Sequence, residues 1–350
     1  MPVAATRAGT DPTPGLKETH SAEHAGERSQ NDSVLLRVEK LRTRFHTKNG
    51  LVRAVNGVSF SIGPGEVVGI VGESGCGKSV TALSILGLIR PPGEIVSGRV
   101  LFEGQDLVGA SSGTLRRIRG KEIAMIFQNP LSSLNPVLTI GFQIQEAILE
   151  HDRIGRRAAR ERALDLLQRV GIPEAERRLH QYPHQFSGGM AQRAMIAMAL
   201  ANRPKLLIAD EPTTALDVTI QAQIIRLLHR LSGELGMAVL FITHNMGLVA
   251  ENCHQTLVMY AGKIAESGAT DDLFARPLHP YTQALLACVP EVKGERHDLI
   301  PLEGFPPDLT VESRGCAFEP RCAQRFDRCP IEDPEPRDAE PGHAVRCHLY

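Results

Sequence analysis

The sequence predicts an α/β fold built around a parallel sheet. Short apolar runs have the length of buried strands, and they lie at 67–71, 122–127, 206–209 and 238–242. Helical patterns separate them, among them the long amphipathic stretch from Val218 to Leu235. Strands that alternate with helices along the chain are typical of a parallel sheet.

The chain has 350 residues, of which 42% are hydrophobic. This length fits one large domain with a smaller unit, or two modest domains. Lys and Arg number 39 and Asp and Glu 40, which gives a net charge of −1. A dedicated nucleic-acid binder usually carries a strongly basic face, so this balance argues against one. The apolar runs fall far short of the ~20 residues that cross a bilayer, and the N-terminus lacks the apolar stretch of a secretory signal. We therefore expect a chain without a membrane span, in the cytoplasm.

The outer parts of the chain differ from its middle. Residues 1–33 are expected to be a disordered tail, because they have almost no large apolar side chains. Order is predicted to begin near Val34 with one strand, followed by a second over Val52–Ile62. A helical insertion rich in Arg, Glu and Leu is predicted from about Val137 to Val170, and a weak hairpin pattern follows at 255–260 and 263–266.

The residues after the first buried strand match a phosphate-binding motif. Gly72-Glu73-Ser74-Gly75-Cys76-Gly77-Lys78-Ser79 has the pattern G-x-x-x-x-G-K-[ST] and stands between a predicted strand and a predicted helix, as the motif requires. Glycines let successive backbone N–H groups point at phosphate oxygens, and the helix N-terminus adds its positive dipole end. Lys78 is expected to reach the β- and γ-phosphates, and the Ser79 hydroxyl to ligate Mg²⁺. The expected nucleotide-binding residues of this loop are Gly72, Ser74, Gly75, Cys76, Gly77, Lys78, Ser79 and Val80.

Two acids end the apolar strand at 206–209. A buried strand of a parallel sheet delivers the residues at its carboxyl end to the edge where ligands bind. Asp210 is expected to hold Mg²⁺, directly or through water, and Glu211 to polarise the attacking water as general base. Alone, this Asp-Glu-Pro sequence would be an ordinary solvated turn. The phosphate loop makes ATP hydrolysis the better interpretation.

Together with these two motifs, an ordered series of others resembles the ATP-binding subunits of ABC transporters over about Leu36 to Val289. Phe127-Gln128-Asn129-Pro130 looks like the Q-loop, and Phe186-Ser187-Gly188-Gly189-Met190 is similar to the signature but departs from its commoner form at Phe186 and Met190. Ala215-Leu216-Asp217 looks like the D-loop, and Ile242-Thr243-His244-Asn245 resembles the switch-histidine segment. The resemblance implies a P-loop NTPase with a RecA-like core, an antiparallel β subdomain and a helical subdomain at about 129–190. The nucleotide-binding domain would cover 34–289, and a Cys-containing C-terminal extension 290–350.

The resemblance also implies roles for single side chains in binding ATP and Mg²⁺. Gln128 would sense Mg²⁺ and the attacking water, and His244 would contact the γ-phosphate. Lys78, Gln128 and His244 thus join Glu211 as expected catalytic residues. Phe45 is our candidate for stacking on adenine, since an aromatic face over a base is worth about 1–3 kcal/mol. Its alternative is a place in the core.

The signature has its own physical interpretation. Ser187, Gly188 and Gly189 precede an apolar helix, so they form a second helix N-terminus that can receive phosphate. The family resemblance implies that they complete the ATP site of a second subunit in a head-to-tail dimer, and Asp217 of the D-loop is counted with them. A plain capped helix is the alternative, because Ser187 is a good cap.

The segment after the cassette is more specific. Leu278-His279-Pro280-Tyr281 looks like the His-Pro-Tyr segment of oligopeptide and dipeptide importers, and the run from Gln128 to Pro136 is also typical of them. The signature resembles that of their D-type ATPase, which pairs with an F-type partner. The resemblance implies a heterodimer of ATPases beneath two permease chains, fed by a substrate-binding protein and peripheral to the cytoplasmic face of the plasma membrane.

Four of the seven cysteines gather in the Pro-rich region after Pro290, which shows little periodicity and is expected to need something other than a core to hold it. Their spacing, C-x₅-C-x₆-C-x₁₇-C, lacks the C-x₂₋₄-C pairs of structural zinc sites. Four thiolates in such a segment can instead hold a [4Fe–4S] cluster, and the peptide-importer resemblance implies the same cluster. Zinc and free buried thiols are the alternatives. The four residues are Cys316, Cys322, Cys329 and Cys347.

The sequence thus predicts an ATPase that powers the import of di- and oligopeptides through a separate permease. The helical insertion would move the permease, and hydrolysis at Glu211 would reset it. One alternative is the ATPase of a nickel or other small-solute importer of the same subfamily. The other is a regulatory ABC ATPase with an iron–sulfur site that acts without a permease.

Overall fold

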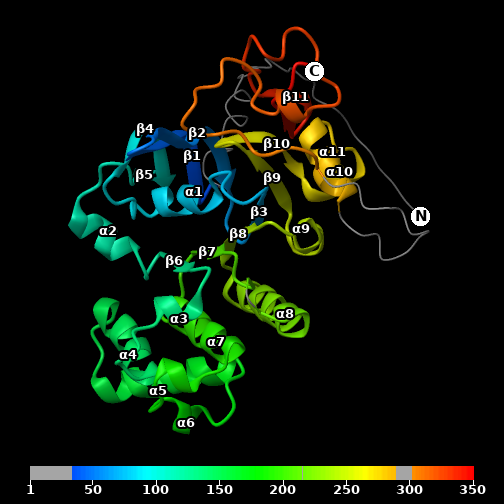
Figure 1. The fold of residues 1–350 in the computed structure, drawn as a ribbon. Coiled ribbons are helices and arrows are strands. Elements are labelled where there is room, and N and C mark those ends of the chain that lie inside the picture. The colour runs from blue at the N-terminus through cyan, green and yellow to red at the C-terminus, as the bar shows by residue number, and fades with distance from the viewer. Residues whose placement is uncertain (1–33, 215, 289–301) are drawn as a thin grey trace, which may run out of the picture. The chain divides into compact units, whose positions relative to one another are not determined.

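The computed structural model describes residues 34–214, 216–288 and 302–350 (Figure 1). The expected tail at 1–33 lies outside the described residues, as do Ala215 of the D-loop and the expected domain boundary at 289–290. In the part of the chain that is described, no helix is both long enough and apolar enough to span a bilayer.

A central sheet carries the buried strands that the sequence predicts. Its strands, in chain order, are β3 (Val67–Val71), β6 (Ile123–Ile126), β7 (Leu206–Asp210), β8 (Ala238–Thr243), β9 (Gln255–Tyr260), β10 (Lys263–Ala269), β11 (Arg337–Glu340) and β12 (His343–Val345). They are ordered β11-β12-β10-β9-β3-β8-β7-β6. The half from β9 to β6 is parallel, and every residue of β7 and β8 is buried. The alternation of strand and helix patterns therefore predicted β3, β6, β7 and β8 correctly, and the weak hairpin pattern corresponds to the antiparallel pair of β9 and β10.

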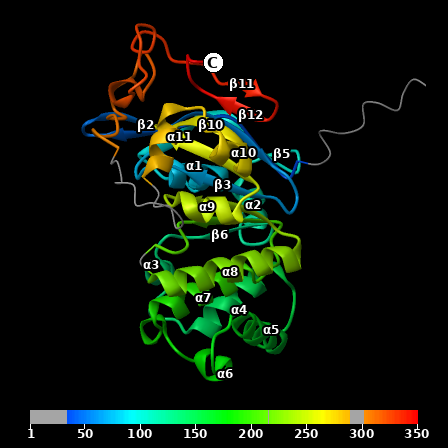
Figure 2. The same ribbon diagram turned by 90° about the vertical axis from the view of Figure 1, so that its right-hand side faces the viewer.

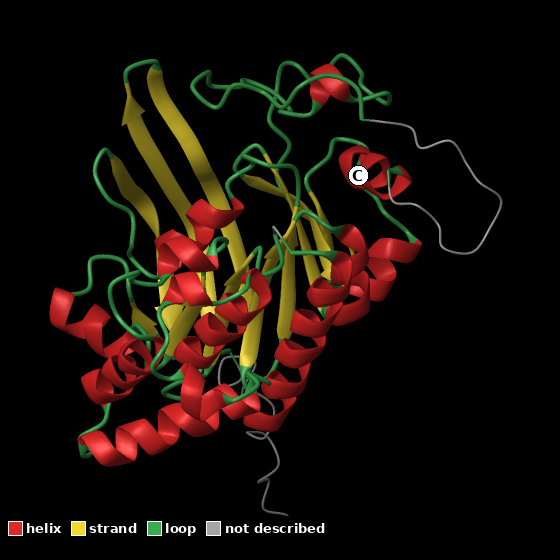
Figure 3. Cartoon of the chain, turned by 60° about the horizontal axis from the view of Figure 1, so that its bottom comes forward, coloured by secondary structure: helices red, strands yellow, loops and turns green. Residues whose placement is uncertain are grey.

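A second, antiparallel sheet holds β1 (Leu36–Thr47), β2 (Gly50–Ile62), β4 (Gly93–Phe102) and β5 (Gln105–Asp106), in the order β2-β1-β4-β5. Helix α1 (Lys78–Ile85) contacts β1 and β2 of this sheet and β7 of the central one, so it packs between the two. Figure 3 shows the strands of the fold together with the helices that cover them. The sequence predicts the first two strands of the antiparallel sheet but not β4. Most of its residues are at least partly exposed, and no continuous apolar run marks it.

Helices dominate the chain between β6 and β7. They are α3 (Pro130–Ser133), α4 (Ile140–His151), α5 (Arg156–Arg169), α6 (Ala175–Arg178), a 3₁₀ turn η1 (Pro183–Gln185) and α7 (Gly188–Ala199). The break between α4 and α5 falls where Asp152 to Gly155 interrupt the helical pattern. The apolar faces of these helices share one core with β6 and β7, which includes Ile144, Leu167 and Ile196. The remaining helices are α2 (Ser112–Ile118), α8 (Val218–Leu235), α9 (Met246–Asn252), α10 (Thr270–Ala275), α11 (Pro280–Ala287) and the 3₁₀ turn η2 (Glu319–Arg321).

The C-terminal extension is tied into the central sheet. Strand β12 pairs antiparallel with β10, so the end of the chain lengthens the sheet. The centre of the Phe318 ring lies 5.3 Å from the centre of the Tyr260 ring and 5.4 Å from that of the Tyr281 ring, inside a small apolar cluster. The expectation that this segment needs something other than a core to hold it is therefore wrong in part, because Phe318 is buried in this cluster. The cluster gave no periodic signal in the sequence, because it joins the extension to residues of β9 and α11.

Candidate functional site

The phosphate loop is a tight turn between β3 and α1 that only glycine can make at two points. A Cβ on Gly72, whose φ is +154°, would lie 2.1 Å from the Met259 carbonyl oxygen. A Cβ on Gly77, with φ of +109°, would lie 2.2 Å from the carbonyl oxygen of Ala54. The loop thus threads between β9 and β2 at backbone contact distance, which requires residues without side chains.

Lys78 opens α1 and folds back across the loop. Its ammonium is almost fully buried and donates hydrogen bonds to the carbonyl oxygens of Gly72, at 2.7 Å, and of Glu73, at 2.9 Å. No side chain caps α1, since its N-cap is Gly77. The first N–H groups of the helix are therefore left to another acceptor, as in an anion site.

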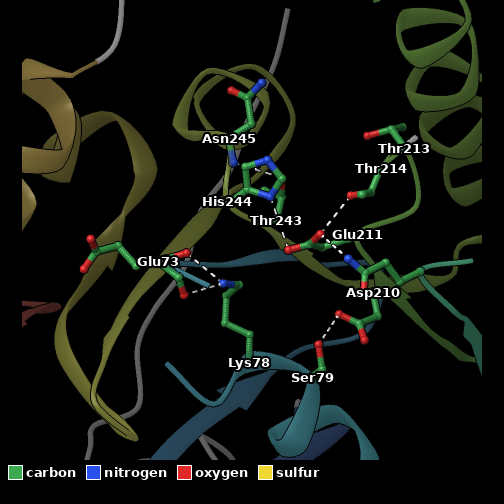
Figure 4. A network of polar contacts seen from close by, with 12 residues as sticks. Glu73, Lys78, Ser79, Asp210, Glu211, Thr213, Thr214, Thr243, His244 and Asn245 are labelled. Carbon is green, nitrogen blue, oxygen red and sulfur yellow. Dashed lines mark hydrogen bonds and ion pairs between the residues drawn. The ribbon is translucent and has the colours of Figure 1, made fainter. Parts of the chain in front are cut away.

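Two oxygen donors meet beside this helix. Ser79 Oγ donates a hydrogen bond to Asp210 Oδ1 at 2.9 Å, which joins α1 to the carboxyl end of β7 (Figure 4). Burial raises the pKa of the Asp210 carboxyl, while the Ser79 hydroxyl acts in the opposite direction. The hydroxyl and carboxylate expected to hold Mg²⁺ thus lie together.

Glu211 is the centre of a second group of contacts at the same sheet edge (Figure 4). One carboxylate oxygen, Oε2, accepts hydrogen bonds from Gln128 Nε2 and Thr214 Oγ1, both at 2.8 Å. The other, Oε1, lies 3.2 Å from His244 Nδ1. Burial alone would raise the pKa of Glu211, but the contacts with Thr214 and His244 together hold it below its ordinary value. The carboxylate is therefore ionised and oriented at neutral pH.

The signature and Asp217 of the D-loop lie elsewhere, at the N-termini of the neighbouring helices α7 and α8 (Figure 2). Ser187 Oγ accepts a hydrogen bond from the Met190 N–H and caps α7, and Asp217 Oδ1 accepts one from the Ile220 N–H and caps α8. Gly189 is so close to α8 that a Cβ there would lie 2.9 Å from Ile220 Cγ2. Ser187, Gly188, Gly189 and Asp217 thus form one surface, and the structure does not bring them to the phosphate loop of the same chain.

Phe45 lies on β1, opposite Gly93 of β4. A Cβ on Gly93 would lie 2.5 Å from Phe45 Cε1, so the half-buried ring rests against that glycine. Stacking of Phe45 on adenine stays a prediction.

The comparisons with known proteins agree with this geometry. Residues 55–214 match the family described as "ABC transporter", and residues 265–329 match "Oligopeptide/dipeptide transporter, C-terminal region". The chain is 51% identical to the dipeptide transport ATP-binding protein DppD of Escherichia coli, over 90% of this chain and 96% of the other. It belongs to the ATP-binding subunits of ABC transporters.

Further relatives place this ABC ATPase more closely. A probable peptide ABC transporter ATP-binding protein, y4tR of Sinorhizobium fredii, is 52% identical over 90% of this chain and 94% of its own length. The oligopeptide transport ATP-binding protein AppD of Bacillus subtilis is 47% identical over 91% and 97%. Among solved structures, the ATP-binding cassette MJ0796 in a dimeric, post-hydrolysis state with ADP and Pi is 28% identical, with a TM-score of 0.61 over 67% of this chain and 98% of that one. The expected fold and ATPase activity are thereby confirmed.

The four C-terminal cysteines of the ABC ATPase line one small cavity, together with His279 and Phe318. The Cys316 N–H donates a hydrogen bond to the Cys329 carbonyl oxygen at 2.7 Å. Burial raises the pKa of the Cys316 thiol to about 11, and it also raises the pKa values of Cys322 and Cys347. Within 34–214, 216–288 and 302–350, however, no three His, Cys, Asp or Glu side chains are arranged to hold a single metal ion.

Three residues at the ATP site are not among those that the sequence predicts. Thr214 orients Glu211, and the run of two threonines after the acids was its signal. Tyr281 and Arg321 contact Glu73 of the phosphate loop from the C-terminal part of the chain. No sequence pattern connects residues 208 and 248 positions apart, so these contacts had no signal.

Proposed function

We propose that this chain is the ATP-hydrolysing subunit that powers uptake of di- and oligopeptides through a separate permease. The observation that carries the proposal is the union of two parts in one chain. One is an ATP site centred on Glu211, and the other is a C-terminal region that matches the oligopeptide/dipeptide transporter family. The relatives named above carry peptide or dipeptide transport in their names, which supports this substrate class over nickel.

The residues of the phosphate loop bind the nucleotide and its metal ion. Lys78 exchanges its loop carbonyls for the β- and γ-phosphates, and the N–H groups at the start of α1 receive phosphate oxygens. Ser79 and Asp210 offer the hard oxygen donors that Mg²⁺ prefers. When bound there, Mg²⁺ would neutralise charge that develops on the phosphates.

Glu211 is the general base in this proposal. Its carboxylate is ionised, and two hydrogen bonds to one oxygen fix its orientation. A base of this kind accepts the proton of the attacking water. Gln128 and His244 contact different oxygens of this carboxylate. Gln128 thereby links it to the helical segment after β6, and His244 links it to the loop after β8.

A second ATPase subunit completes the ATP site in this proposal. The chain presents two helix N-termini that suit phosphate, the phosphate loop at α1 and the signature at α7, on different surfaces. Two chains in head-to-tail order would bring each signature to the other chain's loop. An F-type ATPase is the proposed partner, which makes the assembly a heterodimer.

An apolar groove offers a docking place for the permease. Its volume is about 300 Å³, and it lies between the edge strand β6 and the helices α4 and α7. Methionines at 125, 195 and 198 line it, with the half-exposed Phe127 directly before Gln128. Methionine side chains adapt to partner helices, so a helix of the permease is the proposed occupant. The subunit would then sit at the cytoplasmic face of the membrane.

The cysteine cavity is proposed to hold a [4Fe–4S] cluster. All four cysteines line one cavity. Their spacing along the chain lacks the C-x₂₋₄-C pairs of structural zinc sites, and four thiolates are the ligand set of a four-iron cluster, which supports the cluster over zinc. Bound there, it would join the segments around Cys316, Cys322, Cys329 and Cys347.

The proposal is tested by reconstituting the chain with its permease and the partner ATPase in liposomes. We expect a peptide-loaded binding protein to stimulate ATP hydrolysis, and nickel to have no effect. Liposomes with the Glu211→Gln variant are the matched control for hydrolysis by other proteins. Stimulation by nickel but not by any peptide would contradict the substrate class. Equal hydrolysis with and without permease and solute would favour a regulatory ATPase.

A further inference from the structure

Glu73, the second residue of the phosphate loop, is held by the C-terminal extension. Arg321 of η2 donates two parallel hydrogen bonds to its carboxylate, from Nη1 to Oε2 at 2.7 Å and from Nη2 to Oε1 at 3.0 Å. The Arg321 side chain is only 4% exposed, and that of Glu73 is 26% exposed. A two-pronged, largely buried pair of this kind is among the stronger polar contacts in proteins.

Arg321 is itself fixed from other sides. Its Nε donates a hydrogen bond to the Glu303 carbonyl oxygen at 2.9 Å, and its guanidinium lies 5.9 Å from the centre of the Tyr260 ring. Its Nη1 also contacts the Tyr260 hydroxyl at 3.3 Å. The guanidinium therefore has little freedom to follow Glu73 if the loop moves.

Tyr281, the second residue of α11, holds the backbone of Glu73. Its hydroxyl accepts a hydrogen bond from the Glu73 N–H at 3.0 Å, and its side chain is fully buried. The Tyr260 and Phe318 rings pack against it, with ring centres 4.5 and 5.4 Å away. The carbonyl of Glu73 in turn accepts a hydrogen bond from the Lys78 ammonium. All three polar parts of Glu73 are thus engaged: the N–H by α11, the carboxylate by the C-terminal extension and the carbonyl by Lys78.

We propose that Arg321 and Tyr281 are positioning residues for ATP binding. They fix the Glu73 peptide, and through it the loop and the lysine that receive the phosphates. The C-terminal extension is then a working part of the ATP site and not an appendage. Arg321 directly precedes Cys322. A movement of Cys322 at the cysteine cavity would therefore displace Arg321 and, through its ion pair with Glu73, the phosphate loop. The proposal rests on ATP binding at this loop, and not on the identity of the transported solute.

The test compares ATP affinity and turnover of the full chain with those of three variants. Arg321→Ala is expected to weaken ATP binding about tenfold with a smaller change in kcat, since the contact acts before the chemical step. Arg321→Lys keeps the charge but loses the paired geometry, so it restores affinity only in part. Arg325→Ala is the matched control, because Arg325 lies on the same extension, is exposed and pairs with Glu319 instead.

Coupling separates a positioning role from general loss of stability. In a Glu73→Gln background, Arg321→Ala is expected to add little further loss, because its partner is already gone. Should Arg321→Ala fail to fold, the ATP affinity of Tyr281→Phe tests the proposal. This variant removes only the hydroxyl that accepts the hydrogen bond from the Glu73 N–H. Parental ATP affinity in Arg321→Ala or in folded Tyr281→Phe would overturn the proposal. Absence of ATP binding by the parent chain would instead refute the proposed function.

Discussion

Gln128 Nε2 donates a hydrogen bond to Glu211 Oε2 at 2.8 Å, although the two residues are 83 positions apart. Neighbouring parallel strands account for the contact, because Gln128 follows β6 and Glu211 follows β7 at the same sheet edge. Gln128 also leads directly into the helices from α3 onward. A shift of those helices would therefore change the hydrogen bond to the carboxylate that we assign as general base.

Replacing Glu211 by Gln removes the base but keeps a side chain of the same shape. We expect ATP hydrolysis to fall by about 10²–10⁴-fold, the usual contribution of a general base, with ATP binding retained. Phosphate release measures the loss of hydrolysis, and nucleotide binding on the same preparation measures the retained affinity for ATP. Thr214→Val serves as a control that only loosens the carboxylate. Hydrolysis at the parent rate would show that Glu211 is not the base.

Replacing Gln128 by Glu sets a second negative charge beside Glu211. Like charges disfavour ionisation, so the pKa of Glu211 is expected to rise from its lowered value. The acid limb of the pH–rate profile then moves to higher pH, because the base must be ionised to work. Gln128→Ala removes the hydrogen bond without adding charge and is expected to shift the limb less. Superimposable profiles of the parent and Gln128→Glu would contradict the contact.

The buried His279 makes stability depend on pH. Burial lowers its pKa from 6.5 to about 4, so the folded chain resists a proton that the unfolded chain accepts. Its contribution is complete above pH 6.5 and is lost as the pH falls toward 4, up to about 3 kcal/mol. His279→Asn retains an acceptor for the Tyr281 N–H and is expected to lose less stability over this range. Denaturant unfolding at pH 7 and pH 4.5 checks this, and equal losses in both proteins would count against it.

Removing one cysteine of the cavity tests the proposed cluster. After anaerobic reconstitution with iron and sulfide, the parent is expected to hold four irons per chain, as a [4Fe–4S] cluster requires. Cys329→Ser is expected to lose most of that iron, whereas Cys253→Ser, a buried cysteine away from the cavity, is expected to keep it. Iron analysis and visible absorption provide the measurement. Equal iron in both variants, or zinc in place of iron, would refute the cluster.

The sequence predicted the core of the site well, for a physical reason. Phosphate loops, strand-end acids and the strand–helix alternation are local patterns, and the parallel sheet brings them to one edge. Ser79 contacts Asp210, Glu211 follows it directly and Figure 4 shows Lys78 beside them, while their roles in ATP hydrolysis stay predictions. Helix α8 matches its expected bounds because its amphipathic period is long and uninterrupted.

What the sequence could not provide lies in contacts between distant segments. Strand β4 carries mixed polar and apolar residues, and its position depends on pairing with β1. Phe318 finds its partners on β9 and α11, so its environment has no trace in neighbouring residues. The pair of Arg321 with Glu73 arises only when the C-terminal extension folds back on the cassette.

Uptake of labelled peptides by cells is the measurement that tests the central claim most directly. The only copy of this chain would be replaced by the Glu211→Gln form, and uptake of labelled di-, tri- and pentapeptides and of nickel would be followed. We predict that peptide uptake is lost while nickel uptake is unchanged. Peptide uptake at the parental level in cells that depend on the variant would contradict the account.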